Sequence, residues 1–126
     1  MLTESRAFSG FAVSDADAAA RFYTRVLGLR VEQNAGTAGL LTLHLGGGPT
    51  VLVYPRPDHV PATFTVLNFP VADVAATVRE LAARGVVFER YPGLPQDDDG
   101  VMRGHGPDIA WFTDPAGNIF SVLAAG

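Results

Sequence analysis

The sequence predicts an α+β fold of two βαβββ modules that form a curved mixed sheet around a cleft, with the helices on the outer face. Three observations predict it: a segment duplicated in the two halves, an amphipathic helix pattern in each copy, and two strands around a tight turn after each helix. With 126 residues, of which 48% are hydrophobic and 17% charged, we expect one domain with a well-formed core. The first module covers about residues 6–55, the linker about 56–62 and the second module about 63–125.

The duplication is seen when "FAVSDADAAARFYTRVLGLRVE" is aligned with "LNFPVADVAATVRELAARGVVFE". Each copy begins with an apolar strand and reaches an aspartate, Asp15 or Asp73, suited to cap a helix. An alanine-rich segment with apolar residues at helical spacing then leads to a glycine, Gly28 or Gly85, typical of a helix C-terminus. A short strand that carries a glutamate follows in both copies.

Two further strands around a tight turn complete each module. They are predicted in "GLLTLHLGGGPTVLVYP", which turns at residues 46–49, and in "DIAWFTDPAGNIFSVLA", which turns at residues 114–117. The proline-rich segment "YPRPDHVPATF" links the modules. Because each half-sheet carries a helix on one face only, its other face is buried when the modules curve around each other, and this predicts an enclosed pocket.

The composition excludes several classes of function. A net charge of −4 provides no basic surface for nucleic acid, and the lack of cysteine excludes disulfides, thiolate nucleophiles and zinc–cysteine sites. Neither a signal peptide nor an apolar run of membrane-spanning length is visible. We therefore expect a soluble, cytoplasmic protein with no membrane partner.

The chain resembles the vicinal oxygen chelate superfamily, which includes glyoxalase I, bleomycin-resistance proteins and extradiol dioxygenases. The segment "DADAAARFYTRVLGLRV" matches the family's Asp-capped helix with an aromatic pair and a Leu-Gly end, and "FTDPAGNIFSVL" matches its Asp-Pro-x-Gly-Asn hairpin. The resemblance covers nearly the whole chain. It implies paired βαβββ modules and, commonly, a homodimer.

Metal-dependent members of this family hold a divalent cation with His or Glu on the first strand of each module and Glu on a last strand. The resemblance places the first-strand positions at Phe8 and Val66 and the last-strand positions near Leu52 and at Ser121. Three of these side chains have no donor atom, and a serine hydroxyl alone is a poor ligand. We therefore expect no metal and no other cofactor, which excludes an extradiol dioxygenase and metal-dependent glyoxalase chemistry.

Strand alternation predicts which side chains face the cleft. In "LLTLHL" the leucines are expected to face the helix, so Thr42 and His44 should face the cleft. Matching the turn of the second module to that of the first predicts that Trp111 and Thr113 also face the cleft. Continuing the alternation adds Phe8, Gly10, Leu52, Tyr54, Val66, Asn68 and Ser121. This mostly apolar cup with a few polar points is typical of a small-molecule pocket.

The ligand-binding candidates in this lining are Phe8, His44, Tyr54, Asn68, Trp111 and Ser121, together with Arg103 in the loop "VMRGHGPD". His44 is either an acid–base or hydrogen-bonding group of the pocket or a strand histidine bonded to a neighbour. Trp111 either stacks on a planar ligand or fills the core. Arg103 either clamps a carboxylate or phosphate or is solvent-exposed.

Two functions are open. The first is a metal-independent binding protein, similar to the drug-sequestering branch of the family, that holds a small aromatic or amphipathic molecule in the cleft. The second is a glyoxalase-like lyase or isomerase that uses His44 as acid–base without a metal. We favour the first, because no carboxylate in the predicted cup is placed to tune His44; the facing of Glu32 and Glu89 is left open.

Overall fold

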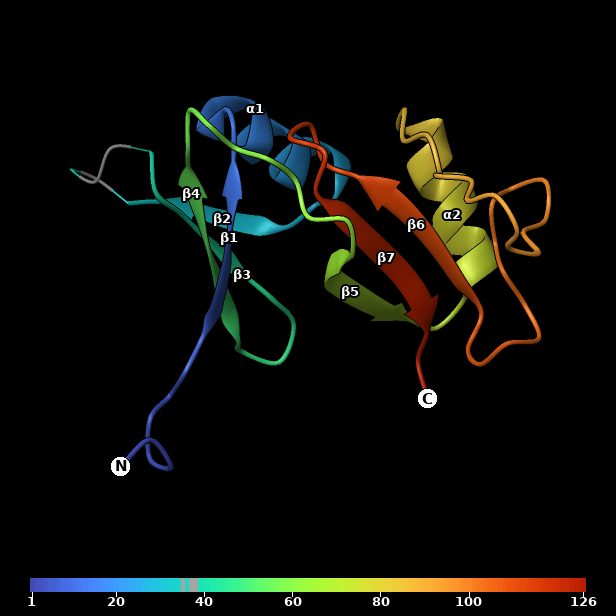
Figure 1. Cartoon of the computed structure of the whole chain (residues 1–126), viewed down its shortest axis with the longest axis horizontal. Coiled ribbons are helices and arrows are strands. Elements are labelled where there is room, and N and C mark those ends of the chain that lie inside the picture. The colour runs from blue at the N-terminus through green and yellow to red at the C-terminus, as the bar shows by residue number, and fades with distance from the viewer. Residues whose placement is uncertain (35, 37–38) are drawn as a thin grey trace. The chain divides into compact units, whose positions relative to one another are not determined.

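The computed structural model describes residues 1–34, 36 and 39–126 and consists of two compact units, residues 1–59 and 60–126. The first unit contains β1 (Ser9–Val13), α1 (Ala16–Arg21), η1 (Phe22–Val26), β2 (Arg30–Gln33), β3 (Leu41–His44) and β4 (Thr50–Pro55). The second contains β5 (Thr65–Val71), α2 (Val74–Ala83), β6 (Ile109–Thr113) and β7 (Ile119–Ala124). Figure 1 shows a twisted sheet with its helix in each unit. The α+β class is as predicted, and the first module has the predicted order of elements.

The two sheets repeat one topology. The first has the strand order β1-β4-β3-β2, in which β1 runs parallel to β4 and the other pairs are antiparallel. The second has the order β5-β7-β6, in which β5 runs parallel to β7 and β6 is antiparallel. The predicted duplication of the sequence is therefore also a duplication of the strand pairing.

The short strand expected between α2 and β6 does not form as a strand. It is reduced to one bridge between Phe88 and Phe112, followed by a hydrogen bond from Glu89 N to Trp111 O of 2.7 Å. The Gln96 side-chain amide donates to the Glu89 carbonyl at 2.8 Å. This carbonyl is therefore not available to extend the backbone pairing with β6. The chain consequently leaves the sheet after this bridge.

Both predicted helix caps are confirmed. The Asp15 and Asp73 carboxylates each accept a hydrogen bond from the backbone N–H three residues further on, at 3.1 Å and 3.0 Å respectively. Gly28 and Gly85, which follow the helices, have φ values of 69° and 96°. This left-handed conformation ends a helix and is strained for residues with a side chain.

The first helix changes from α to π geometry in its second half. Leu27 N donates to Phe22 O, five residues earlier, at 3.2 Å. Tyr23, in this π-helical turn, is fully buried, and its ring meets that of Phe11 edge-on with 6.5 Å between centroids. Tyr23 therefore serves the core of the first unit, as predicted for the helix stripe.

Burial alternates along β3 and β6. In β3, Leu41 and Leu43 are buried and the residues between and after them are half-exposed; Leu45, expected to follow the same phase, lies beyond the strand and is half-exposed. In β6, Ala110 and Phe112 are buried. Each sheet therefore has one face packed against its helix and one face that the helix leaves uncovered, which we call the open face.

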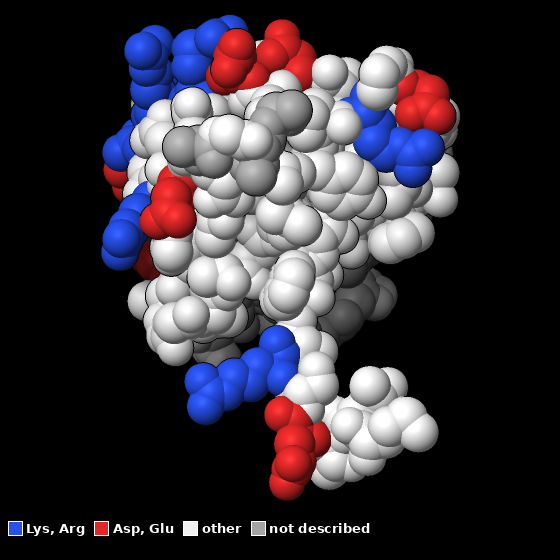
Figure 2. Space-filling model, turned by 90° about the vertical axis from the view of Figure 1, so that its left-hand side faces the viewer, with Lys and Arg blue, Asp and Glu red and all other residues white. Residues whose placement is uncertain are grey.

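The segment before β1 extends away from the first sheet, and its residues 1–8 are exposed (Figure 1). Figure 2 shows a face of the molecule that is uncharged over most of its centre, with charged side chains toward its margins and on a projecting segment. None of the helices in the described part of the chain has the length and apolar character needed to cross a bilayer.

Candidate functional site

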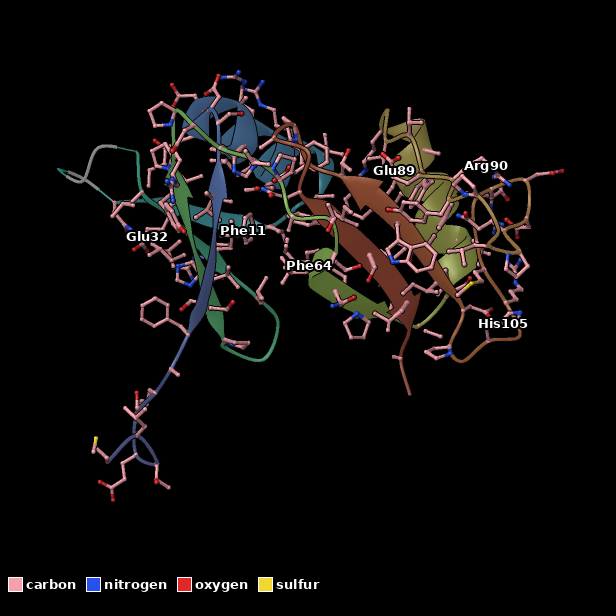
Figure 3. All side chains as sticks on the ribbon, in the orientation of Figure 1. Phe11, Glu32, Phe64, Glu89, Arg90 and His105 are labelled. Atoms are coloured by element: carbon pink, nitrogen blue, oxygen red, sulfur yellow. The ribbon has the colours of Figure 1, made fainter. Side chains whose placement is uncertain are left out.

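The strand register places one row of side chains across each open face. In the first unit this row consists of Glu32, Thr42, Leu52 and Gly10. In the second it contains Trp111, Ser121 and Asn68. In Figure 3, Glu32 and the buried Phe11 lie on opposite sides of the first sheet, as this register requires.

These rows do not fit the divalent cation that the resemblance implies. Ser121 pairs with Asn68 and not with Val66, which lies in a bulge between Thr65 and Leu67. Ser121 is fully buried, and its hydroxyl donates to Asn68 Oδ1 at 2.6 Å. Within the described residues no three His, Cys, Asp or Glu side chains gather into a possible metal site. A leucine, a glycine and a serine–amide pair do not supply the ligand set that hard or borderline cations need.

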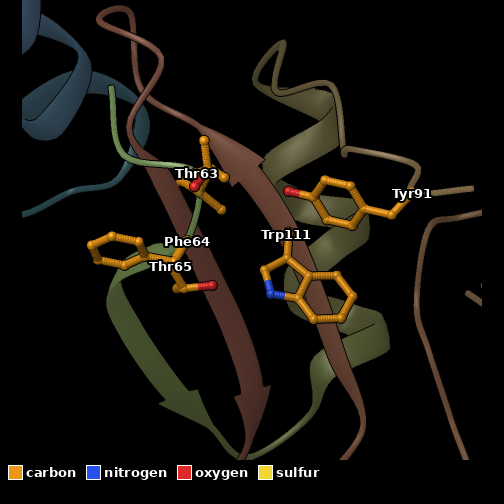
Figure 4. A pocket seen from close by; sticks show the side chains of 6 residues that line it. Thr63, Phe64, Thr65, Tyr91 and Trp111 are labelled. Atoms are coloured by element: carbon orange, nitrogen blue, oxygen red, sulfur yellow. The ribbon is translucent and has the colours of Figure 1, made fainter. Parts of the chain in front are cut away.

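The second unit has a pocket of about 230 Å³. Its walls come from the chain entering β5, from the loop after the Phe88 bridge, and from β6 and β7; they are Thr63, Phe64, Thr65, Tyr91, Trp111 and Ile119 (Figure 4). The Tyr91 and Trp111 rings meet edge-on, with 5.5 Å between centroids and 70° between planes. Trp111 therefore lines a pocket rather than filling a closed core.

The loop after the bridge holds Tyr91 in place through Gln96. The Gln96 side-chain oxygen accepts a hydrogen bond from Tyr91 N at 2.8 Å, and its amide nitrogen donates to the carbonyls of Glu89 and Gly100, both at 2.8 Å. One side chain thus ties three points of the loop together. Burial, assisted by the negative charge of Glu89, raises the pKa of the Tyr91 hydroxyl.

Arg103 is occupied within the same loop. Its guanidinium pairs with the Asp97 carboxylate, and its Nε lies 3.5 Å from Asp108 Oδ2. Asp97 also accepts hydrogen bonds from the N–H groups of Asp99 and Val101, both at 2.9 Å. Although partial burial disfavours ionisation of Asp97, these bonds and Arg103 outweigh it and hold its pKa below the usual value. In this arrangement Arg103 stabilises the loop.

The open face of the first unit brings together a histidine and a carboxylate. His44 Nε2 lies 3.5 Å from Glu32 Oε1, and the His44 and Glu32 side chains are 28% and 57% exposed. Nε2 is buried, and no hydrogen bond of good geometry reaches it from the described residues. The expectation that no carboxylate is placed to act on His44 was wrong, because the pairing of β2 with β3 turns Glu32 to the same face.

The remaining candidates lie on or beside the open face of the first unit. Tyr54, on β4, is half-exposed and pairs with Ala12. Phe8 precedes β1 and is 68% exposed. Sequence reasoning missed Tyr91 and the three residues that enter β5. Strand alternation does not reach Tyr91, because the chain leaves the sheet after the Phe88 bridge.

The family assignment follows from comparison with known proteins. Residues 7–122 match the model of the Glyoxalase/Bleomycin resistance protein/Dioxygenase superfamily. Because this match covers most of the chain, the protein belongs to that superfamily. No curated protein sequence matches the chain significantly.

Solved structures share the fold. TnmS3, an antibiotic binding protein from Streptomyces sp. CB03234, is 22% identical, with a TM-score of 0.69 over 98% of this chain and 99% of that chain. A superfamily member from Sphaerobacter thermophilus is 22% identical, with a TM-score of 0.68 over 94% and 97%. The fosfomycin resistance protein FosX from Listeria monocytogenes is 11% identical, with a TM-score of 0.72 over 98% and 94%. At these identities the likeness shows the fold alone.

Proposed function

We propose that the protein is a metal-independent binding protein that holds a small aromatic or amphipathic molecule in the pocket beside Trp111. The observation that carries this proposal is the pocket itself: an edge-on pair of aromatic rings and a third aromatic residue surround about 230 Å³ of space, with hydroxyl groups at its margin. Aromatic walls with a few polar groups are characteristic of sites for planar organic ligands.

The fold supports the same class of function. The neighbours include a protein described as antibiotic-binding and another described as a fosfomycin resistance protein. Other proteins with this fold are thus described as binding small molecules or conferring resistance to them. We infer no specific ligand from these names.

Metal independence rests on the positions where the resemblance places metal ligands. Phe8, Val66 and Leu52 offer no side-chain donor, and the Ser121 hydroxyl is engaged by Asn68. Elemental analysis of protein purified without chelator tests this directly. Stoichiometric nickel, zinc, manganese or iron that survives dialysis would contradict it.

Ligand binding is tested through Trp111, the single tryptophan of the chain. A planar ligand in the pocket is expected to quench or shift Trp111 emission in a saturable manner, and Trp111→Ala is expected to weaken binding measured by calorimetry at least tenfold. Equal affinity of the Trp111→Ala variant and the unaltered protein would exclude this pocket as the binding site.

The Glu32–His44 contact favours a second candidate function, a metal-independent lyase or isomerase that uses His44 for proton transfer. A carboxylate beside an imidazole can orient it for proton transfer. His44→Ala is expected to abolish turnover of a substrate, and Glu32→Gln to reduce it and change its pH profile. If both variants turned over substrate like the unaltered protein, His44 and Glu32 would have no part in the reaction.

A homodimer and a cytoplasmic location complete the proposal. The outer edges of β1 and β5 carry no partner strand among the described residues, and the exposed Phe8 and Phe64 lie beside them. Such edges are commonly covered in an assembly. Light scattering after size exclusion should give twice the 13.3 kDa mass of the chain; a monomer at micromolar concentration would contradict the dimer.

A further inference from the structure

The pocket beside Trp111 contains four polar groups that form no hydrogen bond within the described residues. They are the indole N–H of Trp111 and the hydroxyls of Tyr91, Thr63 and Thr65. In Figure 4 the Tyr91 hydroxyl turns toward Thr63, and the nitrogen edge of Trp111 turns toward Thr65. The polar groups thus face the space between the aromatic walls and are available to a ligand.

Two of these groups favour a ligand that accepts hydrogen bonds. The Trp111 indole can only donate. The Tyr91 hydroxyl is protonated at neutral pH, as tyrosine ordinarily is, and can donate; burial and Glu89 raise its pKa further. The threonine hydroxyls donate or accept according to the ligand. A bound molecule therefore meets at least two donors beside the aromatic rings, and a ligand without an acceptor leaves them unpaired when it excludes water.

The charge near the pocket selects against one kind of acceptor. Glu89 lies opposite Trp111, to whose carbonyl its backbone N–H donates at 2.7 Å, and after burial its negative charge is the second cause that raises the pKa of the Tyr91 hydroxyl. A carboxylate or phenolate of a ligand at the same place experiences the same repulsion. Both arginines of the neighbouring loop are engaged: Arg103 pairs with Asp97 and Asp108, and the Arg90 guanidinium donates to the backbone carbonyls of Gln96 and Asp97. A neutral oxygen meets the donors without this repulsion.

We infer that the pocket selects planar compounds with a neutral carbonyl oxygen at the ring edge over both hydrocarbons and carboxylates of the same shape. This inference rests on the proposed binding function and adds the chemical class of the ligand. Recognition combines contact with the Trp111 and Tyr91 rings, which any planar compound makes, and hydrogen bonds from Trp111 Nε1 and Tyr91 Oη, which only an acceptor receives.

Three tricyclic probes of nearly equal size separate these contributions: fluorene, 9-fluorenone and 9-fluorenone-4-carboxylate. Calorimetry of the full chain at pH 7.5 is expected to show fluorenone binding roughly five- to tenfold more tightly than fluorene, as one or two net hydrogen bonds allow. The carboxylate is expected to bind more weakly than fluorenone, and to recover at high salt.

Variants assign the preference to the two donors. Tyr91→Phe keeps the ring and removes the hydroxyl, so the affinity ratio of fluorenone to fluorene should fall by roughly threefold or more. In Tyr91→Phe combined with Trp111→Phe the ratio should approach one. Fluorene binding by Tyr91→Phe close to that of the unaltered protein shows that the pocket is intact.

The outcomes distinguish this inference from the proposed function. Equal binding of fluorene and fluorenone to the unaltered protein, or a ratio unchanged in the double variant, would overturn the inference and leave a binding pocket. Tighter binding of the carboxylate than of fluorenone would overturn the preference for a neutral ligand. No binding of any probe up to its solubility would reject both the inference and the proposed function.

Discussion

Replacing Asp114 by alanine tests the turn that connects β6 to β7 and so carries the strand bearing Trp111. The Asp114 side chain is buried, with 3% of its surface exposed. One of its oxygens accepts hydrogen bonds from the backbone N–H groups of Ala116 and Asn118, at 3.0 and 2.8 Å. The other accepts from the Asn118 side-chain amide at 3.0 Å. This network explains why the Asp-Pro-Ala-Gly-Asn sequence has an aspartate at its start and an asparagine at its end.

The cost of the substitution follows from these three contacts. A net contribution of about 1 kcal/mol for each hydrogen bond gives a loss of about 3 kcal/mol in the free energy of unfolding. For a chain of this length, about 3–5 °C per kcal/mol corresponds to a fall of roughly 10–15 °C in Tm. Asp114→Asn keeps the shape and turns one acceptor into a donor that faces Asn118, so its loss is expected to be about 1–2 kcal/mol.

Urea denaturation followed by Trp111 fluorescence measures these changes. Asp98→Ala is the matched control, because Asp98 is an exposed carboxylate with no hydrogen bond or ion pair in the described structure, and it should change stability by less than about 0.5 kcal/mol. If Asp114→Ala were as stable as Asp98→Ala, the turn network would contribute nothing and the reasoning would be refuted.

Three further predictions concern the same unit. Gly117→Ala should cost about 1–3 kcal/mol in thermal unfolding, since Gly117 has a φ of 85° and an added Cβ would lie 3.1 Å from Pro61 Cγ; an unchanged Tm would contradict this strain. Because the pKa of Asp97 is lower in the folded chain than in the unfolded one, its stabilising contribution is present above the unfolded pKa of about 4 and is lost as the pH falls below it. Asp97→Asn should therefore flatten the dependence of stability on pH between about 5 and 2, and a parallel curve would show that Asp97 is not responsible. Gln96→Ala should release Tyr91 and weaken fluorenone binding several-fold, whereas equal affinity would show that the loop does not position the ring.

The local features of the fold were predictable from the sequence because neighbouring residues decide them. Asp15 and Asp73 cap helices through bonds that span three residues, and the β6–β7 turn is closed within five. The leucines of β3 follow the two-residue period of a half-buried strand. These signals recur in both halves of the chain, which is why the two-module architecture could be predicted.

The site was predictable only in part. Trp111 was expected on the open face from strand alternation and the matching turns of the two modules, and it lines the pocket. Its neighbour Tyr91 follows an isolated bridge, where strand alternation is no longer a guide, and its position depends on Gln96. The orientation of Glu32 was open because the short strand "RVEQ" has no clear apolar period; its pairing with β3 fixed it beside His44.

By itself the sequence determined the strand and helix order, the caps and turns, and the absence of histidine and carboxylate from the positions where the resemblance would place metal ligands, since each depends on residue type and short-range spacing. Only the tertiary structure decided that Tyr91 meets Trp111 and that Glu32 meets His44. The register of β2 on β3 places Glu32 beside His44, and a one-residue slip would turn Glu32 to the other face. The hydrogen bonds of Gln96 place Tyr91 beside Trp111.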